Sequence, residues 1–98
     1  MTVELISSLA KFQSLKNEPF EIKLVDAILE AKLSDVVMRG KDPAGARDLY
    51  SLYFQTGPVG ILPQGTYLLR HAKEGECLIF LVPVAGNADG ATYEAVFN

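Results

Sequence analysis

The fold is decided by residues 65–84, GTYLLRHAKEGECLIFLVPV. Two apolar runs in this stretch flank Ala72-Lys73-Glu74-Gly75-Glu76. A three-residue loop with Gly75 in the left-handed conformation gives a type I turn with a bulge, so the stretch predicts a β-hairpin. Both faces of this hairpin are largely apolar, which predicts that it lies at the centre of the fold and is covered on both sides.

The same loop predicts a register for the hairpin. Four pairs are expected across the two strands, Ala72 with Glu76, His71 with Cys77, Leu69 with Ile79 and Tyr67 with Leu81. The opposite face of the hairpin then carries Leu68, Arg70, Leu78, Phe80 and Val82. Because both faces need cover, we expect Phe80 as well as Leu81 to be buried.

Alternation of apolar and polar residues marks the flanking strands. Residues 20–24, 29–33, 50–54 and 92–97 each alternate with a period of two, which is typical of strands with one buried face. Residues 39–48 predict a solvated loop, and Pro83 is expected to stop or bulge the pairing on its side. The sequence therefore predicts a mainly β fold over residues 19–98, a single small antiparallel β-barrel or β-roll of about six strands.

A short α-helix is expected within residues 1–16. Thr2 is a suitable N-cap, and the helix is expected to run from about Val3 to Phe12. Its apolar stripe is formed by Leu5, Ile6, Leu9 and Phe12. We expect this stripe to cover much of the outer face of the hairpin, so that residues 1–98 form one domain.

Composition excludes several classes of protein. The chain has 98 residues, 49% of them hydrophobic and 21% charged, with a net charge of -3, which is typical of a globular domain without an electrostatic footprint for nucleic acid. One Cys excludes an intrachain disulfide, and one Cys with one His makes a zinc site implausible, so we expect no metal and no cofactor. We find no secretory signal and no membrane-spanning run, and we expect a cytoplasmic protein.

Charge is unevenly distributed along the chain. Residues 1–48 hold 15 charged side chains, whereas residues 49–98 hold six. A segment so poor in charge is not expected to expose a whole solvated face. The cover must come from the chain itself or from a partner.

The candidate interface combines the outer face of the hairpin with the apolar connection at residues 57–65, GPVGILPQG. In this connection Ile61 and Leu62 either fold back onto the core or meet a partner. The candidate interface residues are Val59, Ile61, Leu62, Leu68, Leu78, Phe80 and Val96.

Aromatic residues suggest a second kind of site. The strand patterns place four of them in a shared interior, where they could line a small-ligand cavity: Tyr50, Phe54, Tyr67 and Tyr93. The alternative is that they form packed core, since small barrels fill their interior with side chains.

The expected pairing of His71 with Cys77 suggests a third kind of site. A histidine beside a cysteine can generate a thiolate nucleophile. However, no Asn or Asp is evidently placed to orient the imidazole, and a packed thiol with a hydrogen-bonded histidine is the alternative. We therefore assign no catalytic residue.

Three motifs carry a resemblance to a known family: LPQGTY at residues 62–67, FLVPV at 80–84 and YEAVFN at 93–98. With them, the chain resembles an uncharacterised family of short bacterial proteins, a domain of unknown function, over nearly its whole length. The resemblance carries no catalytic residues. Members of that family often lie near phage-tail-like or collar-type genes, so the resemblance implies a structural or adaptor role.

Together these observations predict a non-enzymatic structural or protein-protein interaction module. We expect it to associate with itself or with a partner protein, and to bind neither nucleic acid nor membrane nor metal. One alternative is a barrel that binds a small ligand. The other is an enzyme or redox switch that depends on Cys77 and His71.

Overall fold

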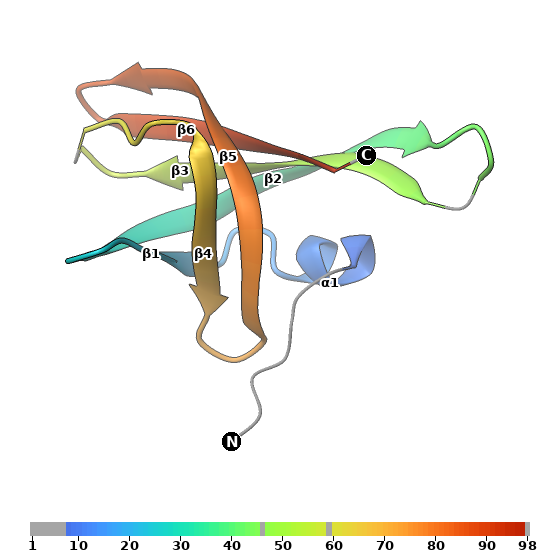
Figure 1. Cartoon of the computed structure of the whole chain (residues 1–98), viewed down its shortest axis with the longest axis horizontal. Helices are drawn as coiled ribbons and strands as arrows, with labels where there is room; N and C mark the ends of the chain where they lie inside the picture. Colours follow the sequence, from blue (N-terminus) through green and yellow to red (C-terminus); the bar gives the residue numbers. More distant parts are fainter. Residues whose placement is uncertain (1–7, 46, 59, 98) are drawn as a thin grey trace.

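The computed structural model describes residues 8–45, 47–58 and 60–97, which form one short helix and six strands (Figure 1). Their bounds are α1 Leu9–Ser14, β1 Pro19–Lys23, β2 Ile28–Lys41, β3 Asp48–Thr56, β4 Gly65–His71, β5 Gly75–Asn87 and β6 Gly90–Phe97. All pairings are antiparallel, and the sheet closes on itself in the order β1-β2-β3-β6-β5-β4. The predicted mainly β fold with a short helix is confirmed.

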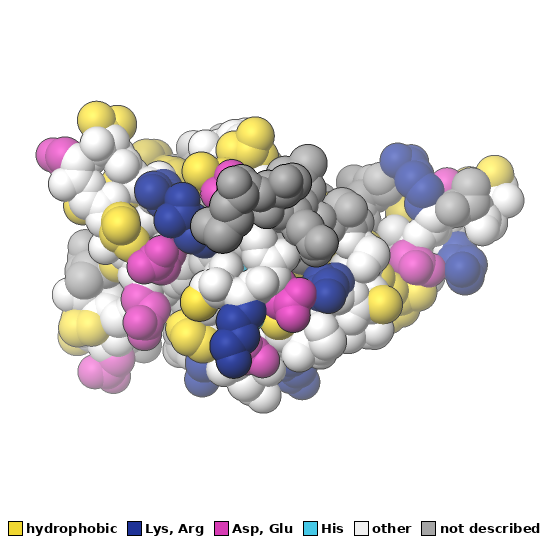
Figure 2. All heavy atoms as spheres, turned by 90° about the horizontal axis from the view of Figure 1, so that it is seen from below, with side chains coloured by type: hydrophobic (Ala, Val, Ile, Leu, Met, Phe, Trp, Pro, Cys, Tyr) yellow, Lys and Arg dark blue, Asp and Glu magenta, His cyan; other side chains and the backbone are white. Residues whose placement is uncertain are grey.

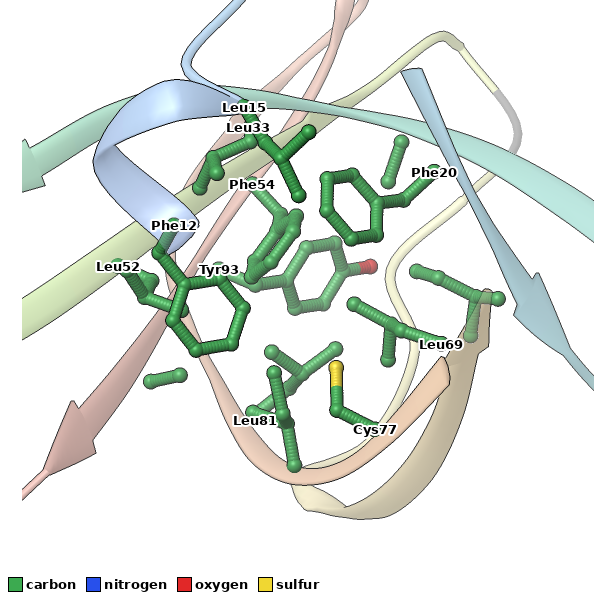
Figure 3. Close-up of a cluster of buried hydrophobic side chains, with 14 of the residues drawn as sticks. Phe12, Leu15, Phe20, Leu33, Leu52, Phe54, Leu69, Cys77, Leu81 and Tyr93 are labelled. Carbon is green, nitrogen blue, oxygen red and sulfur yellow. The ribbon is translucent and has the colours of Figure 1, made fainter. Parts of the chain in front are cut away.

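The alternating patterns place the core as the sequence predicts. In β3, Leu52 and Phe54 are fully buried, and in β6 Tyr93 and Ala95 are buried between more exposed neighbours. Figure 3 shows Leu52, Phe54 and Tyr93 converging with Phe20 on the interior. The buried apolar residues are Phe12, Leu15, Phe20, Ile22, Ala31, Leu33, Tyr50, Leu52, Phe54, Leu69, Cys77, Ile79, Leu81, Ala91, Tyr93 and Ala95.

The predicted loop at residues 39–48 is too long. β2 continues to Lys41 and β3 begins at Asp48, so the connection is residues 42–47 and the two strands project from the barrel as an arm (Figure 1). The root of the arm is fixed by the Arg39 side chain, whose Nη2 donates to the carbonyls of Tyr50 (3.2 Å) and Phe97 (2.8 Å). These contacts are not visible in the local sequence pattern, which shows only Gly and Pro.

Charges at the end of the arm are paired. Lys41 Nζ lies 3.2 Å from Asp48 Oδ1 across the two strands, and Arg47 Nε lies 3.5 Å from Asp42 Oδ2. Figure 2 shows acidic and basic side chains close together on the projecting end, not a patch of one sign. The arm is therefore a mixed-charge surface, and exposed pairs of this kind contribute little to stability.

The predicted register of the β4–β5 hairpin is wrong by two residues. His71 pairs with Gly75, Leu69 with Cys77 and Tyr67 with Ile79, and therefore His71 does not oppose Cys77. Gly75 does have a positive φ of 110°. The loop has three residues, as predicted, but it lies one residue earlier in the chain, at 72–74, where the His71 ring accepts from the backbone N–H groups of Lys73 and Glu74. The faces are unaffected, since a shift of two residues preserves the alternation.

The predicted helix is also corrected. α1 begins at Leu9, with the Ser8 hydroxyl as its N-cap accepting from the Lys11 N–H, and it ends at Ser14, two residues beyond the predicted end at Phe12. The expected start at Thr2 and Val3, and the expected stripe residues Leu5 and Ile6, lie outside the described residues.

α1 does not cover the outer face of the hairpin. Its buried residue, Phe12, instead enters the barrel interior, where its ring centroid lies 6.3 Å from that of Tyr50 and 5.8 Å from that of Phe97. Figure 1 shows α1 below β2, and Figure 3 shows the Phe12 ring beside Leu52. The helix is short, and its largest apolar side chain fills the core.

Candidate functional site

An apolar surface remains exposed on the outside of β5 and β6. Alternation along β5 turns Cys77, Ile79 and Leu81 into the core, so that the residues between them point outward. Of these, Leu78 is 71% exposed and Phe80 is 52% exposed. The predicted burial of Phe80 is therefore wrong, whereas that of Leu81, at 0% exposed, is confirmed.

Residues of β6 and of the end of β5 extend this surface. Val82 pairs with Glu94, and Val96 lies two residues further along β6 on the same face. Val84 and Val96 are about half exposed. Val84 lies at a bulge between Pro83 and Ala85, which confirms the predicted interruption of strand pairing at Pro83. We call this surface the β5–β6 outer face; it consists of Leu78, Phe80, Val82, Val84 and Val96.

Polar pairs border the β5–β6 outer face. Tyr53 Oη donates to Glu94 Oε2 over 2.7 Å, and Arg70 Nε lies 3.6 Å from Glu76 Oε2. The hydrogen bond to Glu94 raises the pKa of Tyr53. Glu94 lies between Val82 and Val96 on this face, so the unbroken apolar row is Leu78, Phe80 and Val82 on β5, with the two polar pairs beside it. Apolar side chains next to satisfied polar groups are common in protein-protein interfaces.

The remaining candidate interface residues lie elsewhere or are partly covered. Leu68, opposite Leu78, is half-buried. Leu62 packs against the core, and its backbone N–H donates to Tyr93 Oη over 2.7 Å. Ile61 is 61% exposed at the end of the barrel where the β3–β4 connection lies, and Val59 lies outside the described residues. The β3–β4 connection thus packs against the core through Leu62, whereas the Ile61 side chain is mostly exposed.

The four aromatic residues expected to line a cavity all take part in packing or in holding a loop. Phe54 and Tyr93 are fully buried, and the Tyr50 ring stacks on Phe97 with centroids 4.7 Å apart. Tyr67 Oη donates to the carbonyl of Pro63 over 2.6 Å. Ligand binding by these residues stays a prediction.

Two shallow hollows lie at the loop end of the barrel, on either side of the β5–β6 turn. Their volumes are about 230 and 220 Å³, and Asn87 and Gly90 line both. The first is lined further by Pro58, Gly60, Ile61 and Ala88, and the second by Gln55, Ala85, Gly86, Asp89 and Thr92. None of the four predicted cavity residues lines either hollow.

Cys77 is buried on the inner face of β5, with its sulfur directed into the core (Figure 3). Burial, together with the charge of Glu76, raises the pKa of the Cys77 thiol to about 12. A nucleophilic cysteine needs the opposite shift, because the thiolate is the reactive form. Its strand partner is Leu69, not His71.

His71 is buried and has defined partners on both ring nitrogens. Nε2 lies 2.7 Å from Glu18 Oε1, and Nδ1 accepts from the backbone N–H groups of Lys73 and Glu74. The sequence analysis identifies no Asn or Asp that could orient the ring, and the residue that does contact it, Glu18, is 53 residues away in the chain. No local signal identifies this contact, which depends on the closure of β1 against β4.

The described residues offer neither a metal-binding cluster nor a membrane-spanning helix. Among residues 8–45, 47–58 and 60–97, no group of three or more His, Cys, Asp or Glu side chains is arranged to hold a metal ion. Within the same ranges, no helix has the length and hydrophobicity needed to span a membrane.

The fold and the site define a small antiparallel β-barrel domain with a packed interior and an exposed apolar outer face. Residues 7–97 match a domain of unknown function, DUF6916, and the chain belongs to this family. This confirms the predicted resemblance to an uncharacterised family. No curated protein and no solved structure matches the chain.

Proposed function

We propose that this protein is a non-enzymatic interaction module that presents the β5–β6 outer face to a partner protein. The observation that carries the proposal is the exposure of Leu78 and Phe80, at 71% and 52%, on adjacent outward positions of one strand. A single exposed apolar residue needs no explanation, but a contiguous group with a polar border is typical of an interaction site.

The energetics favour a partner on this face. Burying a large aliphatic or aromatic side chain completely contributes about 1.5–3 kcal/mol, and aromatic residues at the centre of an interface often dominate binding. Phe80, with Leu78 on one side and Val82 on the other, occupies such a central position. The rigid sheet beneath these side chains lowers the entropic cost of binding.

Properties of the buried groups support a non-enzymatic role. The raised pKa of Cys77 disfavours a thiolate, and the His71 ring is committed to Glu18 and to the turn. We propose a cytoplasmic partner protein or self-association. The family resemblance suggests a phage-tail-like assembly as the setting.

The test compares the double variant Leu78→Ser/Phe80→Ser with Val25→Ser. Val25 is fully exposed in the connection between β1 and β2 and is not part of the β5–β6 outer face, so it serves as the control for loss of an exposed apolar side chain. Light scattering gives the mass of each purified protein, and tagged chains expressed in the native cells give the co-purifying proteins. Urea titration verifies that both variants fold.

We expect the wild type and Val25→Ser to associate, with themselves or with a co-purifying protein. The double variant should bind at least about tenfold more weakly. A wild-type protein that is strictly monomeric and captures no partner contradicts the proposal. Equal loss of association in Val25→Ser contradicts the assignment to the β5–β6 outer face.

A further inference from the structure

His71 is the one histidine of the sequence, and its ring has a fixed pattern of hydrogen bonds. Nδ1 lies 3.2 Å from the backbone N of Lys73 and 3.1 Å from that of Glu74, and Nε2 lies 2.7 Å from Glu18 Oε1. A backbone N–H can only donate, so Nδ1 must be the unprotonated acceptor. The ring proton is therefore on Nε2, which donates it to Glu18.

The ring joins two segments that are distant in sequence. On one side, its Nδ1 holds the β4–β5 turn by two of the turn's backbone amides. On the other, Nε2 holds Glu18, whose own backbone accepts from the Leu33 N–H over 3.0 Å and donates to the Leu15 carbonyl over 3.0 Å. The Phe20 ring, with its centroid 5.2 Å away, packs against the imidazole.

The β4–β5 turn, held by the His71 ring, contacts α1. Glu74 Oε2 lies 2.9 Å from Lys11 Nζ, and the backbone N–H of Glu74 is one of the two that His71 accepts. Phe12, the residue after Lys11, fills the barrel interior beside Tyr50. One chain of contacts thus runs from the imidazole through the turn to the side chain that closes the core.

We propose that His71 is a proton-operated latch, in which protonation of Nδ1 releases the β4–β5 turn and loosens the hold of the turn on α1. The added proton comes from solvent and binds the Nδ1 lone pair. Nδ1 then becomes a donor that faces two donors, so both turn amides lose their acceptor. The turn no longer fixes the position of Glu74 for its contact with Lys11.

The charged groups around the ring confine the change to the turn. Glu18 keeps its hydrogen bond to Nε2 in either protonation state, so the side of the ring that faces β1 stays attached. On the side of the turn, Lys73 and Glu74 face the ring through their backbone N–H groups, and the Glu74 carboxylate pairs with Lys11 of α1. Protonation therefore weakens the turn selectively.

The test is an NMR titration of the intact chain from about pH 8 to about pH 5. Ring carbon-bound protons report protonation of His71, and amide hydrogen exchange, corrected for the intrinsic rate, gives protection factors for Lys73 and Glu74. We expect both protection factors to fall by about tenfold with the same midpoint as the ring, followed by those of α1. Constant protection of the two amides while the ring titrates would overturn the proposal.

Two variants separate the latch from a purely structural role. His71→Asn offers a side-chain oxygen near the position of Nδ1 but does not titrate, so the turn amides should stay protected at low pH. Glu18→Gln leaves a hydrogen-bond partner for Nε2 and should retain the pH response. The same fall in His71→Asn, or α1 protection that stays constant while the turn opens, overturns the latch. If His71→Asn does not fold, the wild-type titration alone decides.

Discussion

The hydroxyl of Tyr93, at the centre of the barrel, accepts a hydrogen bond of 2.7 Å from the backbone N–H of Leu62. Tyr93 is fully buried in β6, and Leu62 belongs to the connection between β3 and β4, 31 residues earlier in the chain. This bond draws the apolar connection onto the end of the barrel. It explains why Leu62 is packed against the core while its neighbour Ile61 is exposed.

Removing this hydroxyl should destabilise the protein. In Tyr93→Phe the ring remains and the half-buried N–H of Leu62 loses its acceptor, so we expect a loss of about 1–3 kcal/mol in the free energy of unfolding. Urea titration measures it. Tyr67→Phe is the matched control, because its hydroxyl bonds the carbonyl of Pro63 in the same connection but in an exposed position, and we expect a smaller loss there. Equal losses would show that burial does not distinguish the two bonds.

Two neighbouring residues of β5 should differ strongly in their contribution to stability. Leu81 is fully buried, so Leu81→Ala should cost about 2–5 kcal/mol through lost burial and a cavity. Phe80 is 52% exposed, so Phe80→Ala should cost about 1 kcal/mol or less. Thermal or urea unfolding of both variants measures the difference. A cost for Phe80→Ala similar to that for Leu81→Ala would indicate that the outer face is covered in the isolated protein.

The sequence predicts the strands and their inner faces because a period of two is a local signal. Leu52, Phe54 and Tyr93 are buried where alternation places them. Periodicity does not report the hairpin register, because a shift of two residues preserves the alternation. In the observed register the His71 ring accepts from two turn amides, a contact that no local pattern indicates.

The prediction that the N-terminal helix covers the outer face of the hairpin is wrong for a different physical reason. The helix pattern identifies an apolar stripe but not its destination, and Phe12 gains more by filling the core than by lying on the outside. The sequence could therefore identify Leu78, Phe80 and Val96 as an apolar surface needing cover. It could not indicate that the described part of the chain leaves them exposed.

Gly90 should be the least replaceable glycine of the β5–β6 turn. Its φ is +151°, and a Cβ at this position would collide with the backbone carbonyl oxygen of Thr56. Because a backbone atom cannot move aside cheaply, we expect Gly90→Ala to cost several kcal/mol, about 3 or more. Gly45→Ala is the control, with φ of +69° and no atom near the added Cβ, and it should cost about 1 kcal/mol. Circular dichroism during thermal unfolding measures both, and equal effects would contradict the steric argument.

Cys77 should resist thiol reagents in the native protein. Burial raises the pKa of the Cys77 thiol to about 12, so the reactive thiolate is scarce in the folded protein at pH 8. We expect a disulfide reagent to label Cys77 no faster than the protein unfolds, and to label it rapidly in urea.

The same shift predicts how stability depends on pH. Because the folded-state pKa is raised, the contribution of the neutral thiol is fully present below about pH 9 and is lost as the pH rises toward about 12. Between these values the unfolded state ionises first, so the free energy of unfolding should fall with pH more steeply in the wild type than in Cys77→Ala. Tyrosine side chains also ionise in this pH range. The difference between the wild type and Cys77→Ala therefore isolates the contribution of the thiol. Rapid labelling of the native thiol at pH 8, or identical pH slopes for the two proteins, would show that Cys77 is accessible and would revive a reactive role for it.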